Sequence, residues 1–236
     1  MPGTFPYQTE RTTLMDSRTR IRRLVGISVF CAIAIVVGLL PGIKVSFLTL
    51  DIKDAVIVIA AMFFGPVSAL FMSIAVPLLE MAFGSTTGFY GFIMNASATL
   101  VFSVAASWFY KKFHTLMGGV LGLLIGSVGM TAVMVGLNLW ITPIYMGASV
   151  DTVLKMIPTL ILPFNLLKAL LNSSIVLILY KPVSMALSQA HMIPEGEKAP
   201  YSYFTKKTMA VLIGGILLMA VCLFALFFWM KGKFAG

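Results

Sequence analysis

The sequence predicts an all-α integral membrane protein. Of its 236 residues, 59% are hydrophobic and 11% are charged, and the mean hydropathy is +1.00. A soluble globular domain has about 25% charged residues, so this much apolar surface cannot be buried in a water-soluble fold. Runs of roughly 20 apolar residues cross a bilayer as helices, which satisfy their own backbone hydrogen bonds. Seven such runs, one of them short, predict seven spans.

Turn residues and polar breaks set the boundaries of the expected spans. Pro41-Gly42 ends the first span, and Gly65-Pro66 separates the short second span from the third. The run GSTTG, residues 84–88, precedes the fourth span. The expected spans are residues 24–40, 53–64, 66–83, 89–110, 116–141, 158–180 and 208–230.

Polar segments divide the chain into four parts. Residues 1–23 are polar and cytoplasmic, with no evident cleavable signal peptide. Residues 24–185 form the membrane domain, and residues 186–207 form a cytoplasmic linker. Residues 208–236 contain an additional C-terminal hydrophobic helix.

Basic residues predict a cytoplasmic N-terminus. With that orientation the inside segments carry eleven Lys and Arg residues and the outside segments five, while Lys168 lies within a span. The net charge of +9 therefore reflects cytoplasmic segments and does not indicate nucleic-acid binding. Cys31 and Cys222 lie in apolar runs and indicate neither a disulfide framework nor a metal site.

Lys168 stands in the middle of an apolar run, LILPFNLLKALLNSSIVLILYKP, residues 160–182. A charge at the bilayer centre costs roughly 3 kcal/mol or more, so we expect Lys168 to face a cavity or a partner. Asn165 and Asn172 share its helix face, because the three residues are spaced i, i+3, i+7. A structural ion pair with Glu80, in the third span, is the alternative.

Other polar groups lie in the outer halves of the spans, with Asn95 in the fourth and Asn138 in the fifth. The first outer loop, PGIKVSFLTLDIKD, is unusually apolar, and we interpret its apolar part, including Leu50, as a lid over a pocket. Its Asp51 and Asp54 either belong to that pocket or cap the second helix. Together these groups predict a small-molecule pocket that opens outward between apolar walls.

Small residues predict two packing faces. Gly118, Gly122 and Gly126 recur every four residues in the fifth span, so another helix can approach it closely. Ser28 and Ala32 form a similar face in the first span. That face is either an ordinary helix contact or a docking surface for a partner protein.

The sequence lacks the motifs of an enzyme. It has no phosphate-binding glycine-lysine motif and no metal-ligand spacing, and His114 and His191 both lie in expected loops. We therefore expect no enzymatic activity, no cofactor and no metal, and an uptake protein of this kind needs an energising partner. A solitary secondary transporter is an alternative, although no internal repeat or interrupted helix pair indicates one.

Three runs resemble the substrate-binding S components of bacterial energy-coupling factor (ECF) vitamin transporters. They are LTLDIKDAVIVIAAMFFGPVSAL, GSTTGFYGFIMNASATLVFSVAASWFYKK and LPFNLLKALLNSSIVLILYKPV. The resemblance covers residues 22–185, and the first and last runs look most like the riboflavin-type branch.

The resemblance implies a six-helix body in the bacterial cell membrane, to which the seventh span is an addition. It implies capture of one vitamin from outside and assembly with a membrane T subunit and two cytoplasmic ATPases, with the S component toppling in the membrane. Riboflavin is the favoured ligand, and pantothenate or another small vitamin is the alternative.

The resemblance also implies roles for particular residues. Ser28 and Ala32 would form the docking face, Asn138 and Lys168 would bind the ligand, and residues 41–51 would act as the lid. The full expected binding set is Lys168, Asn138, Asn165, Asn172, Asn95, Glu80, Leu50 and Asp51.

Overall fold

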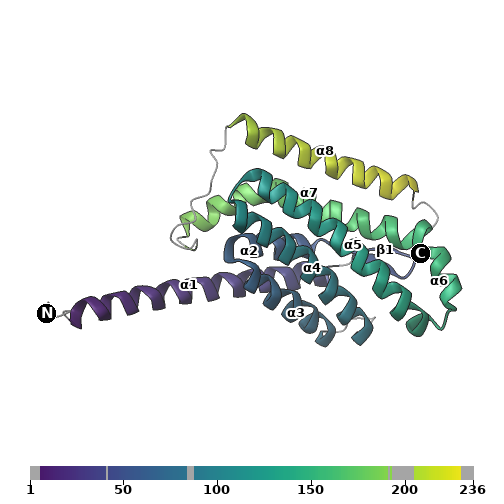
Figure 1. Ribbon diagram of the computed structural model, residues 1–236, viewed down its shortest axis with the longest axis horizontal. Helices are drawn as coiled ribbons and strands as arrows, with labels where there is room; N and C mark the ends of the chain where they lie inside the picture. Colours follow the sequence, from purple (N-terminus) through teal and green to yellow (C-terminus); the bar gives the residue numbers. More distant parts are fainter. Residues whose placement is uncertain (1–5, 41, 84–87, 191, 193–204, 230–236) are drawn as a thin grey trace.

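The computed structural model describes residues 6–40, 42–83, 88–190, 192 and 205–229 and is mainly helical (Figure 1). In chain order its elements are α1 (Pro6–Leu39), β1 (Ile43–Val45), β2 (Leu48–Leu50), α2 (Lys53–Phe64), α3 (Pro66–Ala82), α4 (Gly88–Phe113), α5 (Leu116–Met146), α6 (Val150–Met156), the π-helical turn η1 (Ile157–Ile161), α7 (Leu162–Gln189) and α8 (Lys206–Trp229).

Five helical segments in the described part of the chain are long and apolar enough to cross a membrane, which agrees with the expected membrane fold. They are Thr19–Leu39, Gly88–Phe113, Leu116–Met146, Val150–Gln189 and Lys206–Phe228. Helices α2 and α3 have 12 and 17 residues. At 1.5 Å per residue they are about 18 and 26 Å long, shorter than the roughly 30 Å of hydrocarbon in a bilayer. The expectation of seven spans is therefore not confirmed for these two helices.

The ends of the chain differ from the expected boundaries. Helix α1 runs without a break through residues 6–23, so the expected division at residue 24 does not coincide with a helix end. Parts of the expected segments lie outside the described residues. They are residues 1–5 of the N-terminal segment, residues 191 and 193–204 of the linker and residues 230–236 of the C-terminal helix.

A two-stranded hairpin between α1 and α2 departs from the all-α prediction. Strands β1 and β2 pair antiparallel, with Val45 opposite Leu48. Val45, Leu48 and Leu50 are buried, whereas Lys44 and Thr49 are exposed. Strand β2 thus shows the period-two alternation of a strand, whereas β1 departs from it because Ile43 is also exposed. The alternation is present in the sequence, but strands of three residues are shorter than the runs that indicate a strand.

Helix α2 forms the centre of the fold. Eleven of its twelve residues are buried, because the helix is apolar on every side and packs against α1, α3, α4 and α7. The last carbonyl groups of a helix lack helical donors. Here Lys111 donates to the Phe63 carbonyl and Arg23 to the Phe64 carbonyl, and the Phe63 ring stacks on Tyr180 with centroids 4.9 Å apart.

Close packing of α4 against α5 confirms the predicted glycine face. A Cβ atom added at Gly122 would lie 2.8 Å from the Ala106 carbonyl oxygen, and one added at Gly126 would lie 2.9 Å from that of Phe102. Such distances are too short for any side chain, so glycine allows the two backbones to meet.

The expected sixth span is part of a longer helical stretch that runs from α6 through η1 into α7. Pro163 has no N–H, so it cannot donate to a carbonyl of the preceding turn. The chain widens into a π-helical turn just before it, where the Leu162 N–H bonds to the Ile157 carbonyl.

Helix α8 packs along α7, at the edge of the bundle away from α1 and α3 (Figure 1). Its buried residues are Thr208, Gly215, Cys222 and Leu226. Large apolar side chains such as Leu217 and Val221 remain exposed on the molecule. An outward face of this kind suits contact with lipid.

Candidate functional site

Three polar residues of α7 lie in the interior of the bundle. Asn165, Lys168 and Asn172 are 1%, 5% and 0% exposed. They share one face of the helix because of their i, i+3, i+7 spacing. That face meets the start of α2 and the segment between β2 and α2.

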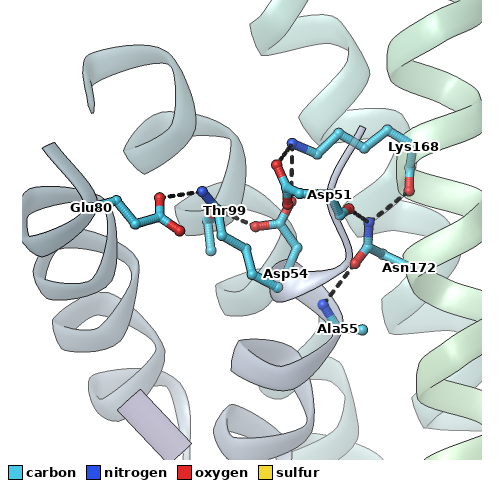
Figure 2. A network of polar contacts seen from close by, with 8 residues as sticks. Asp51, Asp54, Ala55, Glu80, Thr99, Lys168 and Asn172 are labelled. Carbon is cyan, nitrogen blue, oxygen red and sulfur yellow. Dashed lines mark hydrogen bonds and ion pairs between the residues drawn. The ribbon is translucent and has the colours of Figure 1, made fainter. Parts of the chain in front are cut away.

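Lys168 forms an ion pair with Asp51, with its Nζ atom 2.9 Å from Oδ2 (Figure 2). Its Nζ atom is also 3.7 Å from Oδ2 of Asp54. Burial disfavours the charged carboxylate of Asp51, but the attraction of Lys168 and Lys53 outweighs it and lowers the pKa of Asp51 below its ordinary value. The buried cation therefore has carboxylate neighbours that compensate its charge.

The alternative ion pair between Lys168 and Glu80 is wrong. Glu80 instead accepts a hydrogen bond from Lys53, the first residue of α2. Both side chains are almost fully buried. Sequence reasoning placed Lys53 in the outer loop and missed it as a site residue, although it stands between the two aspartates of DIKD.

Asn172 holds the start of α2 against α7. Its Nδ2 atom donates to the carbonyl oxygens of Asp51 and Lys168, both at 3.0 Å, and its Oδ1 atom accepts from the Ala55 N–H at 2.8 Å (Figure 2). All of its hydrogen-bonding atoms are thus engaged with protein, and it does not line the cavity described below. The structure assigns it a positioning contact in place of the expected ligand contact.

The capping interpretation of the two aspartates is confirmed only in part, because Asp54 lies in the first turn of α2, where a negative charge suits the helix dipole. The N-cap residue of α2 is Ile52, and no side-chain hydrogen bond caps that helix. Asp54 instead accepts a hydrogen bond of 2.6 Å from the Thr99 hydroxyl of α4 (Figure 2). Asp51 and Asp54 therefore connect α2 to α7 and α4.

A cavity of about 330 Å³ lies between the hairpin, α1, α3, α4, α5 and the start of α7. Five residues of the expected binding set line it. They are Asp51, Glu80, Asn95, Asn165 and Lys168. Apolar side chains from α1, the hairpin, α4, α5 and α7 complete the wall, among them Phe47, Leu48, Met94, Met134 and Phe164.

Besides Asn172, two further residues of the expected set lie elsewhere. Leu50 is buried in an apolar cluster beneath the hairpin. Asn138 is fully buried in α5, where its Nδ2 atom donates to the Met134 carbonyl and its Oδ1 atom accepts from Thr142. Neither residue lines the cavity.

Two residues that line the cavity, Asp51 and Glu80, each have one carboxylate oxygen that is buried within the protein. Oδ1 of Asp51 and Oε1 of Glu80 are buried and have no hydrogen-bond partner among the described residues. Gly38 of α1 lines the cavity beside Glu80, and a Cβ atom there would lie 1.7 Å from Oε1. A single sequence gives no sign that this glycine makes room for a carboxylate.

The expected docking residues lie on a different face. Ser28 and Ala32 are exposed on α1, next to the exposed apolar side chains of Val25, Val29 and Ile33. This face contributes no residue to the cavity.

Comparison with known proteins places the chain in a family. The family profile described as ECF transporter, substrate-specific component, matches residues 22–180. The riboflavin transporter FmnP of Bacillus subtilis is 29% identical over 189 residues, which cover 73% of this chain and 99% of that protein. The riboflavin transporters RibU of Streptococcus thermophilus and of Staphylococcus aureus are each 28% identical, over 72% and 71% of this chain and 86% and 93% of theirs.

A solved structure agrees with these relatives. The S component of a bacterial ECF transporter superposes with a TM-score of 0.61 and 29% identity, over 71% of this chain and 98% of that one. The chain therefore belongs to the substrate-specific components of ECF transporters, and it is a multi-pass membrane transport protein and not an enzyme.

Proposed function

We propose that this chain captures riboflavin in the cavity beneath the hairpin and delivers it as the substrate-specific subunit of an ECF importer. The observation that carries the proposal is the cavity itself, which combines a buried lysine, two carboxylate side chains and apolar walls. Its volume of about 330 Å³ falls at the lower end of the range for small-molecule sites, about 300–1,000 Å³. The relatives named riboflavin transporters support the choice of vitamin.

The lining suits a ligand with an aromatic part and several hydrogen-bonding groups. Phe47, Phe164 and the methionines of α4 and α5 offer an apolar surface for a ring system. Polar residues that line the same cavity, Asp51, Glu80, Asn165 and Lys168, would supply hydrogen bonds beside that apolar surface. Apolar burial supplies most of the affinity in such a site, and the polar groups fix the orientation.

The proposal includes an orientation and partners. The N-terminus lies in the cytoplasm, the hairpin faces outward as a lid, and a six-helix body within residues 24–185 carries the site, with α8 as an addition. A membrane T subunit and two ATPases supply the energy, with Ser28 and Ala32 on the surface that meets the T subunit. Membership of the family speaks against a solitary secondary transporter.

The deciding experiment is to identify the bound ligand. The full chain is purified in detergent, and any retained molecule is released by denaturation and identified by mass spectrometry. Riboflavin is also mixed with increasing amounts of the protein, and binding is followed by the quenching of riboflavin fluorescence. We expect yellow protein and one flavin per chain. Colourless protein that also fails to quench added riboflavin would overturn the choice of ligand.

A variant links the binding to this cavity. Asn95 lines the cavity and is only partly buried, so Asn95→Leu should fold and lose at most one hydrogen bond to the ligand. We expect riboflavin binding to weaken by about 0.5–1.5 kcal/mol. Lys155→Met, on the exposed surface of α6, is the matched control and should bind as the parent does.

A further inference from the structure

The hairpin and α8 share one buried apolar cluster that is separate from the main core around α2. Helix α8 contributes Cys222 and Leu226, which are 4% and 2% exposed, and the hairpin contributes three of its apolar side chains. The buried members of this hairpin–α8 cluster are Val45, Leu48, Leu50, Leu160, Phe164, Leu171, Cys222 and Leu226.

The hairpin–α8 cluster reaches the wall of the binding cavity. Leu48 and Phe164 belong to the cluster and also line the cavity, and Phe47 packs against the cluster while lining the cavity. The start of α7 thus borders the cavity and the hairpin, and α7 also packs against α8. A change in the packing of α8 on α7 therefore acts on side chains that the ligand would touch.

The hairpin depends on such packing for its position. Its two strands have three residues each, and an isolated two-stranded hairpin is marginally stable at best. Asp51, at its end, is tied to α7 through Lys168 and Asn172. The rest of the hairpin is held through the apolar side chains that enter the cluster.

A helix restrains those side chains in a way that lipid cannot. Lipid tails are as apolar as leucine, so α8 gains little from excluding water, and its effect comes from close packing. A packed neighbour holds the side chains of α7 in single rotamers, whereas fluid acyl chains leave them free to move. Residues 206–229 lie beyond the part that the family profile matches, which ends at residue 180.

We propose that α8 positions the hairpin over the cavity and thereby slows the release of a bound ligand. The effect on release rests on the proposed function, since riboflavin is the ligand that would be measured. The effect on the hairpin does not rest on it, because packing holds the hairpin whether or not the cavity is filled.

The test replaces one buried side chain of α8 in the full chain. Leu226→Ala removes packing from the cluster, and Leu217→Ala is the matched control because Leu217 is 61% exposed on the same helix. Leu226→Met keeps the volume and should restore the parent behaviour. Amide hydrogen exchange is followed without ligand in residues 42–52 and, as an internal reference, in α2. Riboflavin dissociation and association rates are measured on the same proteins.

We expect Leu226→Ala to speed exchange in the hairpin by about tenfold or more, since a buried Leu→Ala change usually costs more free energy than a tenfold change requires. Exchange in α2 and the association rate should stay close to the parent values, and dissociation should speed up with the hairpin. Unchanged hairpin exchange, or an equal rise in α2, would overturn the proposal. If the parent chain binds no riboflavin, the proposed function fails, and the exchange comparison still decides whether α8 positions the hairpin.

Discussion

Lys168 carries a charge in the interior of a membrane protein next to two carboxylates. Its ammonium group is 2.9 Å from Asp51 and 3.7 Å from Asp54, and it also lines the cavity. Breaking a buried ion pair by removing one partner leaves an uncompensated charge. A single substitution of Lys168 therefore changes both the stability of the protein and the lining of the cavity.

Lys168→Met should destabilise the protein by roughly 3–5 kcal/mol, because two buried carboxylates lose their cation. Adding Asp51→Asn to the same chain should recover part of that loss by removing one of the stranded charges. Thermal unfolding in detergent measures both effects. An unchanged unfolding temperature in the single variant would contradict the buried ion pair, and Lys155→Met controls for the loss of a positive charge.

Asn172→Ala should destabilise the protein by about 1–3 kcal/mol, since it leaves the Ala55 N–H and the Asp51 carbonyl without this partner. Asn165→Ala is the comparison, because Asn165 donates to Ile161 within its own helical stretch and holds no other element. Faster hydrogen exchange at the start of α2 is expected for Asn172→Ala and not for Asn165→Ala. Equal effects would mean that Asn172 does not position α2.

At the scale of single elements, the sequence predicted helix positions better than helix roles. The expected span 53–64 coincides with α2, because charged residues begin it and Gly65-Pro66 ends it. The sequence predicted only an apolar lid at the hairpin, because two strands of three residues each are too short to give a recognisable strand pattern. The sequence also could not show that Lys53 pairs with Glu80, since that pairing depends on how α2 meets α3.

The glycine face of α5 allows a direct test of element packing. Gly126→Ala should push α4 away from α5, because its Cβ atom would lie 2.9 Å from the Phe102 carbonyl oxygen. Gly136→Ala is the control in the same helix, since a Cβ atom there meets nothing within 4 Å. We expect Gly126→Ala to lower the unfolding temperature. Gly136→Ala should leave the unfolding temperature unchanged or raise it, because alanine in a helix is up to about 1 kcal/mol more stable than glycine. Similar behaviour of the two variants would contradict the close approach.

At the scale of the whole molecule, the sequence located one face of the site. It predicted that Lys168, Asn165 and Asn172 share a helix face, and all three are buried. The sequence could not show which of the three line the cavity, because cavity lining and hydrogen-bond partners depend on the neighbouring elements. Asn165 and Lys168 line the cavity, whereas Asn172 is engaged with α2. The same limit explains why Asn138, buried within its own helix, was included in the expected set.

The two edges of the bundle allow a test of the proposed docking surface. Ser28 is exposed on α1, at the edge away from α8. Ser28→Trp should leave riboflavin binding unchanged and block uptake in cells, because the bulky ring hinders approach of the T subunit. Trp at Leu217, on the exposed face of α8, is the control and should allow uptake. Normal uptake with Ser28→Trp would rule out this surface.

The central position of α2 determines how a captured molecule could leave. The cavity touches α2 only at Lys53, and beyond it about 18 Å of buried helix leads to an end that Arg23 and Lys111 hold in place. A solute in the cavity thus cannot pass along α2 without disrupting the packing of that helix. On the proposed function, delivery of riboflavin past α2 therefore requires either that the whole binding site moves or that this packing breaks.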